Sequence, residues 1–458
     1  MKTPTPILCA VLIASTCAAP ANWPAWRGPL ANGSAPESQP PTEWSDTKNV
    51  KWKMKLPGHG SATPAVWGER IFVLAAVGPE KKADVPPAEP TPVAVATNNL
   101  SGASTNATAG GRPRRGGGGG RSDKPTEAFK FTVLCLDRNT GRTLWQKVAK
   151  ETIPHEGHHQ DHGFASASPI TDGKVVLAYF GSRGLYCYDM DGNLKWAKEF
   201  GEMRMRGTFG EGASPALHGD VVVVNWDHEG DDFIAALDKN TGRELWRTPR
   251  SEESSWGTPL ILDYKGQKQV IVNATTKVRS YDLLTGKELW VCGGQTGNAI
   301  PCSVADAETV YAISGFRSAA LQAIQLGRTG DLTGTDAVRW SHNKNTPYVP
   351  SPVLAGGRLY FLGQRSAALS CFDTASGKPV FEAETIPGLF NAYASPVASK
   401  EHVYILSRDG KCAVVKQGDK LEVVTINTLG EGVDASIAIV GNELLIRGRE
   451  NLYCIAKN

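Results

Sequence analysis

Four histidines within eight residues form the group with the clearest chemical potential: His155, His158, His159 and His162. Imidazole is the commonest protein ligand for transition metals, so this group could hold Zn²⁺ or Cu²⁺. The spacing matches no established zinc motif. The alternative is a solvated connecting loop with one or two of the rings packed beneath it.

A second candidate site is the acidic loop at residues 225–232, which contains Asp227, Glu229 and Asp231. Carboxylate oxygens are the ligands that Ca²⁺ prefers, although the loop lacks the pattern of a dedicated calcium hand. A solvated turn is the competing interpretation. Glu211, Asp227 and Glu229 could also cleave a glycosidic bond if two of them lie ~5–10 Å apart.

Basic residues recur after predicted second strands, at Arg183, Lys277, Arg317, Arg365, Arg408 and Arg449. Converging cations would favour an anionic ligand. Aromatic residues that could stack on such a ligand are Trp226, Trp256, Phe316, Tyr348, Phe390 and Tyr393. The alternative is ordinary exposed arginines paired with neighbouring acids such as Asp409 and Glu450.

A repeated strand–turn–strand unit must position these residues. Its fullest copy is 236–246, where Asp238 can bond the backbone of the turn and Gly242 can adopt a positive φ. Related copies begin at Cys135, Cys187, Ser280 and Cys371. A period of about 40–50 residues favours a β-propeller.

Eight inner strands are expected near Ser61, Ser166, Ser214, Gly257, Pro301, Ser351, Ser395 and Ala435. They predict an all-β fold, an eight-bladed propeller of four-stranded antiparallel blades over residues 48–458. Residues 49–56 alternate polar and apolar, whereas the last copy, 434–458, has no outer strand. We therefore expect the N-terminal strand to complete the last blade and remove both free edges. Residues 22–47 form an extended segment before it.

The pattern Ala-x-Asp-x-x-Thr-Gly-x-x-x-Trp of residues 236–246 resembles the tryptophan-docking motif of exported bacterial propellers of the pyrroloquinoline quinone (PQQ)-like family. The resemblance implies a structural docking role for Trp52, Trp145, Trp196, Trp246, Trp290 and Trp340. It leaves function open, because the family contains both quinone-dependent dehydrogenases and non-enzymatic scaffolds.

Connections between blades and loops between second and third strands share one face, where binding residues are expected. We favour a non-catalytic scaffold that binds a protein or a carbohydrate through this face. The alternative is a PQQ-dependent dehydrogenase that oxidises an alcohol or a sugar. The resemblance implies that such an enzyme uses PQQ, a Ca²⁺ or similar ion, an Asp base and, typically, a vicinal disulfide. The chain has no adjacent cysteines and is short for such an enzyme; Asp227 or Asp161 would be the base.

The formal net charge of +3 argues against a nucleic-acid binder driven by charge. Residues 1–21 resemble a cleavable secretory signal, which predicts export to the periplasm or beyond, without a membrane span. A lipid anchor at Cys17 is the less favoured alternative. We expect a monomer.

Two further features concern connections. Cys292 and Cys302 flank one inter-blade connection, so a disulfide could form, but spacing alone does not fix its geometry. Residues 78–127 interrupt the first blade with Pro-rich and then Gly/Arg-rich tracts. That composition predicts a disordered insertion.

Overall fold

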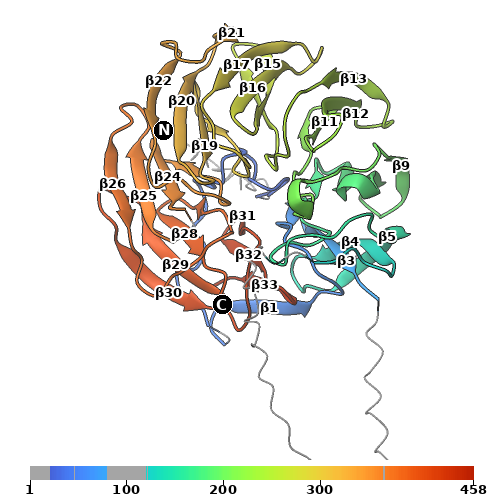
Figure 1. The fold of residues 1–458 in the computed structure, drawn as a ribbon. Coiled ribbons are helices and arrows are strands. Elements are labelled where there is room, and N and C mark those ends of the chain that lie inside the picture. Colours follow the sequence, from blue (N-terminus) through green and yellow to red (C-terminus); the bar gives the residue numbers. More distant parts are fainter. Residues whose placement is uncertain (1–20, 46, 80–119, 121, 365–366, 458) are drawn as a thin grey trace, which may run out of the picture.

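Eight small antiparallel sheets surround a central axis in the computed structural model, which describes residues 21–45, 47–79, 120, 122–364 and 367–457 (Figure 1). The chain passes from sheet to sheet around the ring, so each sheet is one blade. The predicted fold class, an eight-bladed all-β propeller, is confirmed. Most of the predicted insertion at 78–127, and residues 1–20 of the predicted signal at 1–21, lie outside the described residues.

The first four blades are consecutive in sequence. Blade 1 contains β2 (Ala65–Trp67), β3 (Arg70–Val77), β4 (Phe129–Asp137) and β5 (Thr143–Thr152). Blade 2 contains β6 (Ile170–Thr171), β7 (Val175–Tyr179), β8 (Leu185–Asp189) and β9 (Leu194–Lys198). Blade 3 contains β10 (Ala216–His218), β11 (Val221–Trp226), β12 (Phe233–Asp238) and β13 (Glu244–Pro249). Blade 4 contains β14 (Leu260–Tyr264), β15 (Gln267–Asn273), β16 (Lys277–Asp282) and β17 (Glu288–Gly293).

The remaining blades complete the circle. Blade 5 contains β18 (Val304–Ala305), β19 (Thr309–Ser314), β20 (Ala320–Gln325) and β22 (Val338–His342). Blade 6 contains β23 (Val353–Ala355), β24 (Arg358–Leu362), β25 (Leu369–Asp373) and β26 (Pro379–Glu384). Blade 7 contains β27 (Val397–Ala398), β28 (His402–Leu406), β29 (Lys411–Lys416) and β30 (Val423–Thr428). Blade 8 contains β31 (Ala438–Val440), β32 (Glu443–Arg447), β33 (Asn451–Ile455) and β1 (Val50–Lys55).

Strands from opposite ends of the chain close the ring, as predicted. The N-terminal β1 pairs antiparallel with β33, with Trp52 opposite Cys454 and Lys53 opposite Tyr453. The blue β1 and the red β33 lie side by side in Figure 1. Because β1 pairs with the outer edge of β33, the backbone groups along that edge of β33 are hydrogen-bonded and not exposed.

Indole rings connect most neighbouring blades. The rings of Trp52, Trp145, Trp196, Trp246 and Trp340 lie against the turn glycines of the next blade, Gly141, Gly192, Gly242, Gly286 and Gly377. Each indole N–H also donates to a backbone carbonyl of that blade, at 2.8–3.0 Å. These glycines have positive φ, and a side chain there would collide with the ring.

Trp290 behaves differently because blade 4 has a fifth strand. The two-residue β21 (Gly330–Asp331) pairs parallel with β17, where Gly330 lies opposite Trp290. Trp290 is buried and donates to Gln269 Oε1 of its own blade at 3.2 Å. The extra strand lies in residues 327–335, an insertion between β20 and β22 of blade 5.

A belt of small polar side chains lines the axis. The backbone N–H of Thr63, Ser168, Ser214, Thr258, Cys302, Ser351 and Ser395 donates in turn to the side chain of the equivalent residue in the following blade, at 2.8–3.0 Å. Thr63 Oγ1 completes the circle by donating to Ser436 O at 3.1 Å. The first strands begin a few residues later than predicted, since these residues bond across blades.

The described part of residues 22–47 crosses the face that carries the turns between first and second strands, here called the turn face. Trp23 exchanges backbone hydrogen bonds with Val66 of blade 1, and Ala35 donates to Ala398 O of blade 7. Between these contacts the side chain of Arg27 is buried near the ring axis, where it donates to the carbonyls of Pro352 and Pro396. The opposite face, which carries the inter-blade connections, is here called the loop face. Within the described residues, no helix is long and apolar enough to cross a membrane.

Candidate functional site

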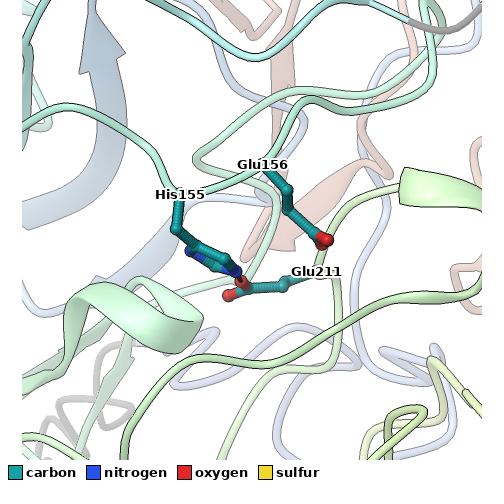
Figure 2. Close-up of side chains that lie close together, drawn as sticks. All are labelled: His155, Glu156 and Glu211. Atoms are coloured by element: carbon teal, nitrogen blue, oxygen red, sulfur yellow. Dashed lines mark ion pairs between the residues drawn. The ribbon is translucent and has the colours of Figure 1, made fainter.

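His155, Glu156 and Glu211 converge on the loop face (Figure 2). The first two belong to the connection from β5 to β6, and Glu211 to the connection from β9 to β10. Their potential ligand atoms lie within 4.8 Å of one another. His155 is a predicted metal ligand and Glu211 a predicted catalytic acid, whereas Glu156 is not among the predicted site residues. No local pattern links Glu156 to a carboxylate in the next connection.

The Glu211 carboxylate already accepts three strong hydrogen bonds. Oε1 accepts from Arg183 Nη1 at 2.8 Å and from Ser182 Oγ at 2.7 Å, and Oε2 accepts from the backbone N–H of Ser182 at 2.6 Å. The side chains of Glu211 and Arg183 are 7% and 6% exposed. This charge is therefore neutralised by its neighbours, as a buried carboxylate requires.

The other two members of the cluster also have partners. His155 Nε2 lies 2.7 Å from Met203 O, which makes this nitrogen a donor and removes it as a metal ligand. Glu156 Oε1 accepts from the backbone N–H of Met205 at 3.3 Å. Burial, together with the nearby Glu211, raises the pKa of Glu156. His155, Glu156 and Glu211 are thus better suited to holding two blade connections together by hydrogen bonds than to binding a divalent metal ion.

The remaining histidines do not join this cluster. His162 Nδ1 lies 2.8 Å from Ser166 Oγ, and burial lowers the pKa of His162 to about 4. His158 Nδ1 contacts His159 O at 2.7 Å, and its ring packs edge-on against Phe164. The predicted four-histidine site is therefore not assembled as such; the one metal-type grouping in the described residues contains only His155.

Asp227, the other prominent candidate, forms a buried ion pair. Its carboxylate receives two bonds from Arg250, Nε to Oδ1 at 2.6 Å and Nη2 to Oδ2 at 3.1 Å, and both side chains are 0% exposed. Asn225 Nδ2 and Ser255 Oγ also donate to Oδ2. Four donors leave this carboxylate poorly placed to take a proton from a substrate.

The rest of the acidic loop is dispersed. Glu229 Oε1 accepts from Ser254 Oγ at 3.0 Å and pairs with Arg206, while Asp231 is exposed. The loop therefore does not gather its carboxylates around a common point, and within the described residues Asp227, Glu229 and Asp231 form no metal-type group.

Several of the predicted cations are paired with acids of other connections. Arg408 bonds Asp161 at 2.9 Å and Asp434 at 2.6 Å, and Arg449 also bonds Asp434. Burial opposes ionisation of Asp161, but the bond from Arg408 prevails and lowers the pKa of this carboxyl. The acids involved are not the sequence neighbours Asp409 and Glu450. Lys277 and Arg317 are exposed, and Arg365 lies outside the described residues.

The predicted aromatic set divides into two groups. Trp226 is buried and stacks on Phe233 at 5.6 Å, and Trp256 is buried and donates to Gly210 O. The accessible group comes from blades 5 to 7 and their connections: Phe316, Tyr348, Phe390 and Tyr393. The ring centroids of Phe316 and Tyr348 lie 5.2 Å apart, and the guanidinium of Arg317 lies over the Phe316 ring. Phe390 is 69% exposed.

The enclosed space beside Asp227 is small. It has a volume of about 20 Å³. Its lining includes Glu156, Tyr179, Arg183, Glu211 and Asn225. Tyr179 OH and Asn225 Oδ1 have no hydrogen-bond partner among the described residues. A volume of this size holds about one water. It does not fit PQQ, which is a planar polyanion with several fused rings.

Cys292 and Cys302 are both free thiols. Cys292 lies on the outer strand of blade 4, whereas Cys302 occupies the axial belt and accepts from Thr258 N at 2.9 Å. Burial raises the pKa of each thiol to about 11. The disulfide considered from spacing is absent, because the two residues belong to different layers.

Residues 130–324, from β4 through β20, match the family model described as "Outer membrane protein assembly factor BamB". The chain carries a PQQ-like propeller repeat. This confirms the resemblance found in the repeated turns, and it places the match on blades 1 to 5. No curated protein matches the chain.

Solved structures show the same fold at low sequence identity. BamB from Moraxella catarrhalis is 14% identical, with a TM-score of 0.51 and coverage of 72% of this chain and 94% of that one. Quinohemoprotein alcohol dehydrogenase from Comamonas testosteroni is 11% identical, with a TM-score of 0.62 and coverage of 96% and 81%. The computationally designed Ika8 protein is 13% identical, with a TM-score of 0.51 and coverage of 74% and 95%. These likenesses concern architecture, which an assembly factor, an enzyme and a designed protein share.

Proposed function

We propose that the protein is an exported, non-catalytic scaffold that binds a protein partner through the loop face of blades 5 to 7. The observation that carries this proposal is the accessible aromatic group of Phe316, Tyr348, Phe390 and Tyr393, interspersed with Arg317 and Arg408. Aromatic residues and arginine are enriched in the energetically important parts of protein interfaces. The family description of the matching model, an assembly factor, supports a protein partner.

The state of the candidate catalytic groups supports the same choice. Asp227 is bound by Arg250, and Asp161 by Arg408 and Tyr393. A general base needs an oxygen within reach of the proton that it removes. Both carboxylates instead join separate loops of this face, which gives the loop face the fixed shape that a docking surface needs.

Site-specific cross-linking tests the scaffold in the producing cell. Phe390 is replaced by p-benzoylphenylalanine, and Leu30, which is 53% exposed on the segment that crosses the turn face, provides the matched control. We expect one discrete cross-linked protein at position 390 and none at position 30. The proposal is wrong if both positions give the same products, or if a glycan array rather than a protein retains the chain.

The alternative is a PQQ-dependent dehydrogenase. The fold shared with the Comamonas enzyme is the observation that favours it. Purified protein is mixed with PQQ and Ca²⁺ and then assayed for a change in melting temperature and for dye reduction with alcohols or sugars. We expect neither response. Substrate-dependent dye reduction would establish the enzyme and remove the scaffold proposal.

Export is part of the proposal and has its own test. It rests on the pattern of residues 1–21, which predicts cleavage before Asn22. Amino-terminal sequencing of the protein from the producing cell should begin at Asn22. A chain that retains Lys2 and Thr3 would contradict export by this route.

A further inference from the structure

The turn face contains a cavity of about 540 Å³ between the N-terminal segment and the adjoining parts of blades 1 to 5. Its wall includes Trp26, Arg27, Trp67, Leu217, Leu260 and Ser303. The volume falls within the range of small-molecule sites, roughly 300–1,000 Å³. It lies on the opposite face from the proposed partner surface, so it requires a separate explanation.

Arg27 gives this cavity an unusual charge. The residue is 5% exposed, and its guanidinium donates to the carbonyls of Pro352 at 2.7 Å and Pro396 at 3.2 Å. Among the described residues, no carboxylate forms an ion pair with it, and Nε has no acceptor. Burial lowers the pKa of Arg27 to about 10, so the side chain remains a cation at neutral pH. A buried cation without a counter-ion favours an anionic occupant nearby.

The other charges of the wall leave this cation uncompensated. Lys239 bonds both acids of the wall, Asp172 at 2.6 Å and Asp220 at 2.8 Å. Counting Arg27, Lys174 and Lys239 against these two carboxylates gives a net charge of +1 for the lining residues. Ser303 Oγ is buried without a hydrogen-bond partner among the described residues, so a second polar group of the wall is unsatisfied.

The remaining wall is apolar and aromatic. Trp26 and Trp67 are both partly exposed, and Leu217, Leu260 and Ile261 complete this side. Indole and aliphatic surfaces favour a flat apolar body, whereas the uncompensated charge of Arg27, buried in the wall, favours a negative charge on the occupant. We propose that this cavity binds a small carboxylate with a flat apolar body, such as an aromatic acid.

The test uses the full mature chain, 2-naphthoate as the probe and 2-naphthamide as its neutral counterpart, with affinities measured by isothermal titration calorimetry. We expect 2-naphthoate to bind roughly tenfold more tightly than the amide, since only the acid can compensate Arg27. Arg27→Gln should make the two affinities equal. Leu217→Trp, which fills the cavity from β10, should weaken both ligands by roughly tenfold or more.

Leu30→Ala provides the control, because Leu30 is exposed on the same segment but does not line the cavity. It should leave both affinities unchanged, and circular dichroism identifies any variant that does not fold. Equal binding of acid and amide to the unaltered protein would overturn the proposal, as would undiminished binding to a folded Leu217→Trp variant. Cross-linking at Phe390 is independent of all these results, so failure here leaves the partner surface untouched.

Discussion

Asp227→Asn should strongly destabilise the propeller, because Asp227 and Arg250 form a bidentate ion pair with both side chains 0% exposed. The substitution removes the charge and replaces one acceptor oxygen with an NH₂ group. That group would face donors from Arg250 or from Asn225 and Ser255. The arginine would remain buried without its main counter-ion.

The expected magnitude follows from this loss. Removing one partner of a buried ion pair costs about 3–5 kcal/mol of unfolding free energy, because the remaining charge is uncompensated. Glu252, whose carboxylate lies 4.0 Å from Arg250, offsets part of the cost. Asp231→Asn is the matched control, since it changes the same residue type in the same loop at an exposed position. It should alter stability by less than about 0.5 kcal/mol.

Urea unfolding followed by far-UV circular dichroism measures both free energies, and Arg250→Met with the double variant completes a mutant cycle. We expect the two losses to be strongly non-additive, because either substitution alone already breaks the pair. A loss below about 1 kcal/mol for Asp227→Asn would refute the structural role assigned here. If that small loss were accompanied by abolished dye reduction in the PQQ assay, Asp227 would be a catalytic base instead.

Three further predictions concern the belt, the closing blade and the histidine loop. Ser395→Ala removes the acceptor of the Ser351 N–H and should cost about 1–3 kcal/mol in urea unfolding. Trp52→Ala removes the indole that lies against Gly141 and should cost about 3–5 kcal/mol by the same measurement. Burial lowers the pKa of His162 from 6.5 to about 4, so the unfolded chain binds this proton first and stability falls as the pH decreases through that interval. His162→Gln should flatten this part of the decline, and a variant with an unchanged pH profile would contradict the assignment.

The architecture was predictable because its causes repeat along the chain. Each Asp–x–x–Thr–Gly turn satisfies its own hydrogen bonds locally; Asp238 Oδ1 accepts from the N–H and the hydroxyl of Thr241. Three such turns, two degenerate copies at Asp189 and Asp373, and the missing outer strand near Tyr453 were enough to predict both the ring and its closure. The extra strand β21 was not predictable, since two residues of an insertion contain no strand periodicity.

The candidate site was only partly predictable, because its interactions join distant connections. Arg408 and Asp161 are 247 residues apart, and no pattern near Arg408 identifies that acid as its partner. The sequence instead pointed to Asp409 and Glu450, the acids next to Arg408 and Arg449, as their partners. The pattern of basic residues after second strands does not include Arg250 either, since Arg250 follows the outer strand β13. A repeat predicts where loops emerge, whereas tertiary geometry decides which of their charges meet.

The two faces differ in whether their buried charged groups are paired with groups of opposite charge. On the loop face, Glu211, Asp227 and Asp434 each bind an arginine, so the interior of that face needs no ligand to neutralise it. On the turn face, Arg27 is held by backbone carbonyls alone and borders a cavity large enough for a small molecule. Rigid, neutralised loops suit the docking of a macromolecule through its exposed side chains. An unneutralised buried cation suits a small anion, so the two proposed sites differ in the class of partner that each can stabilise.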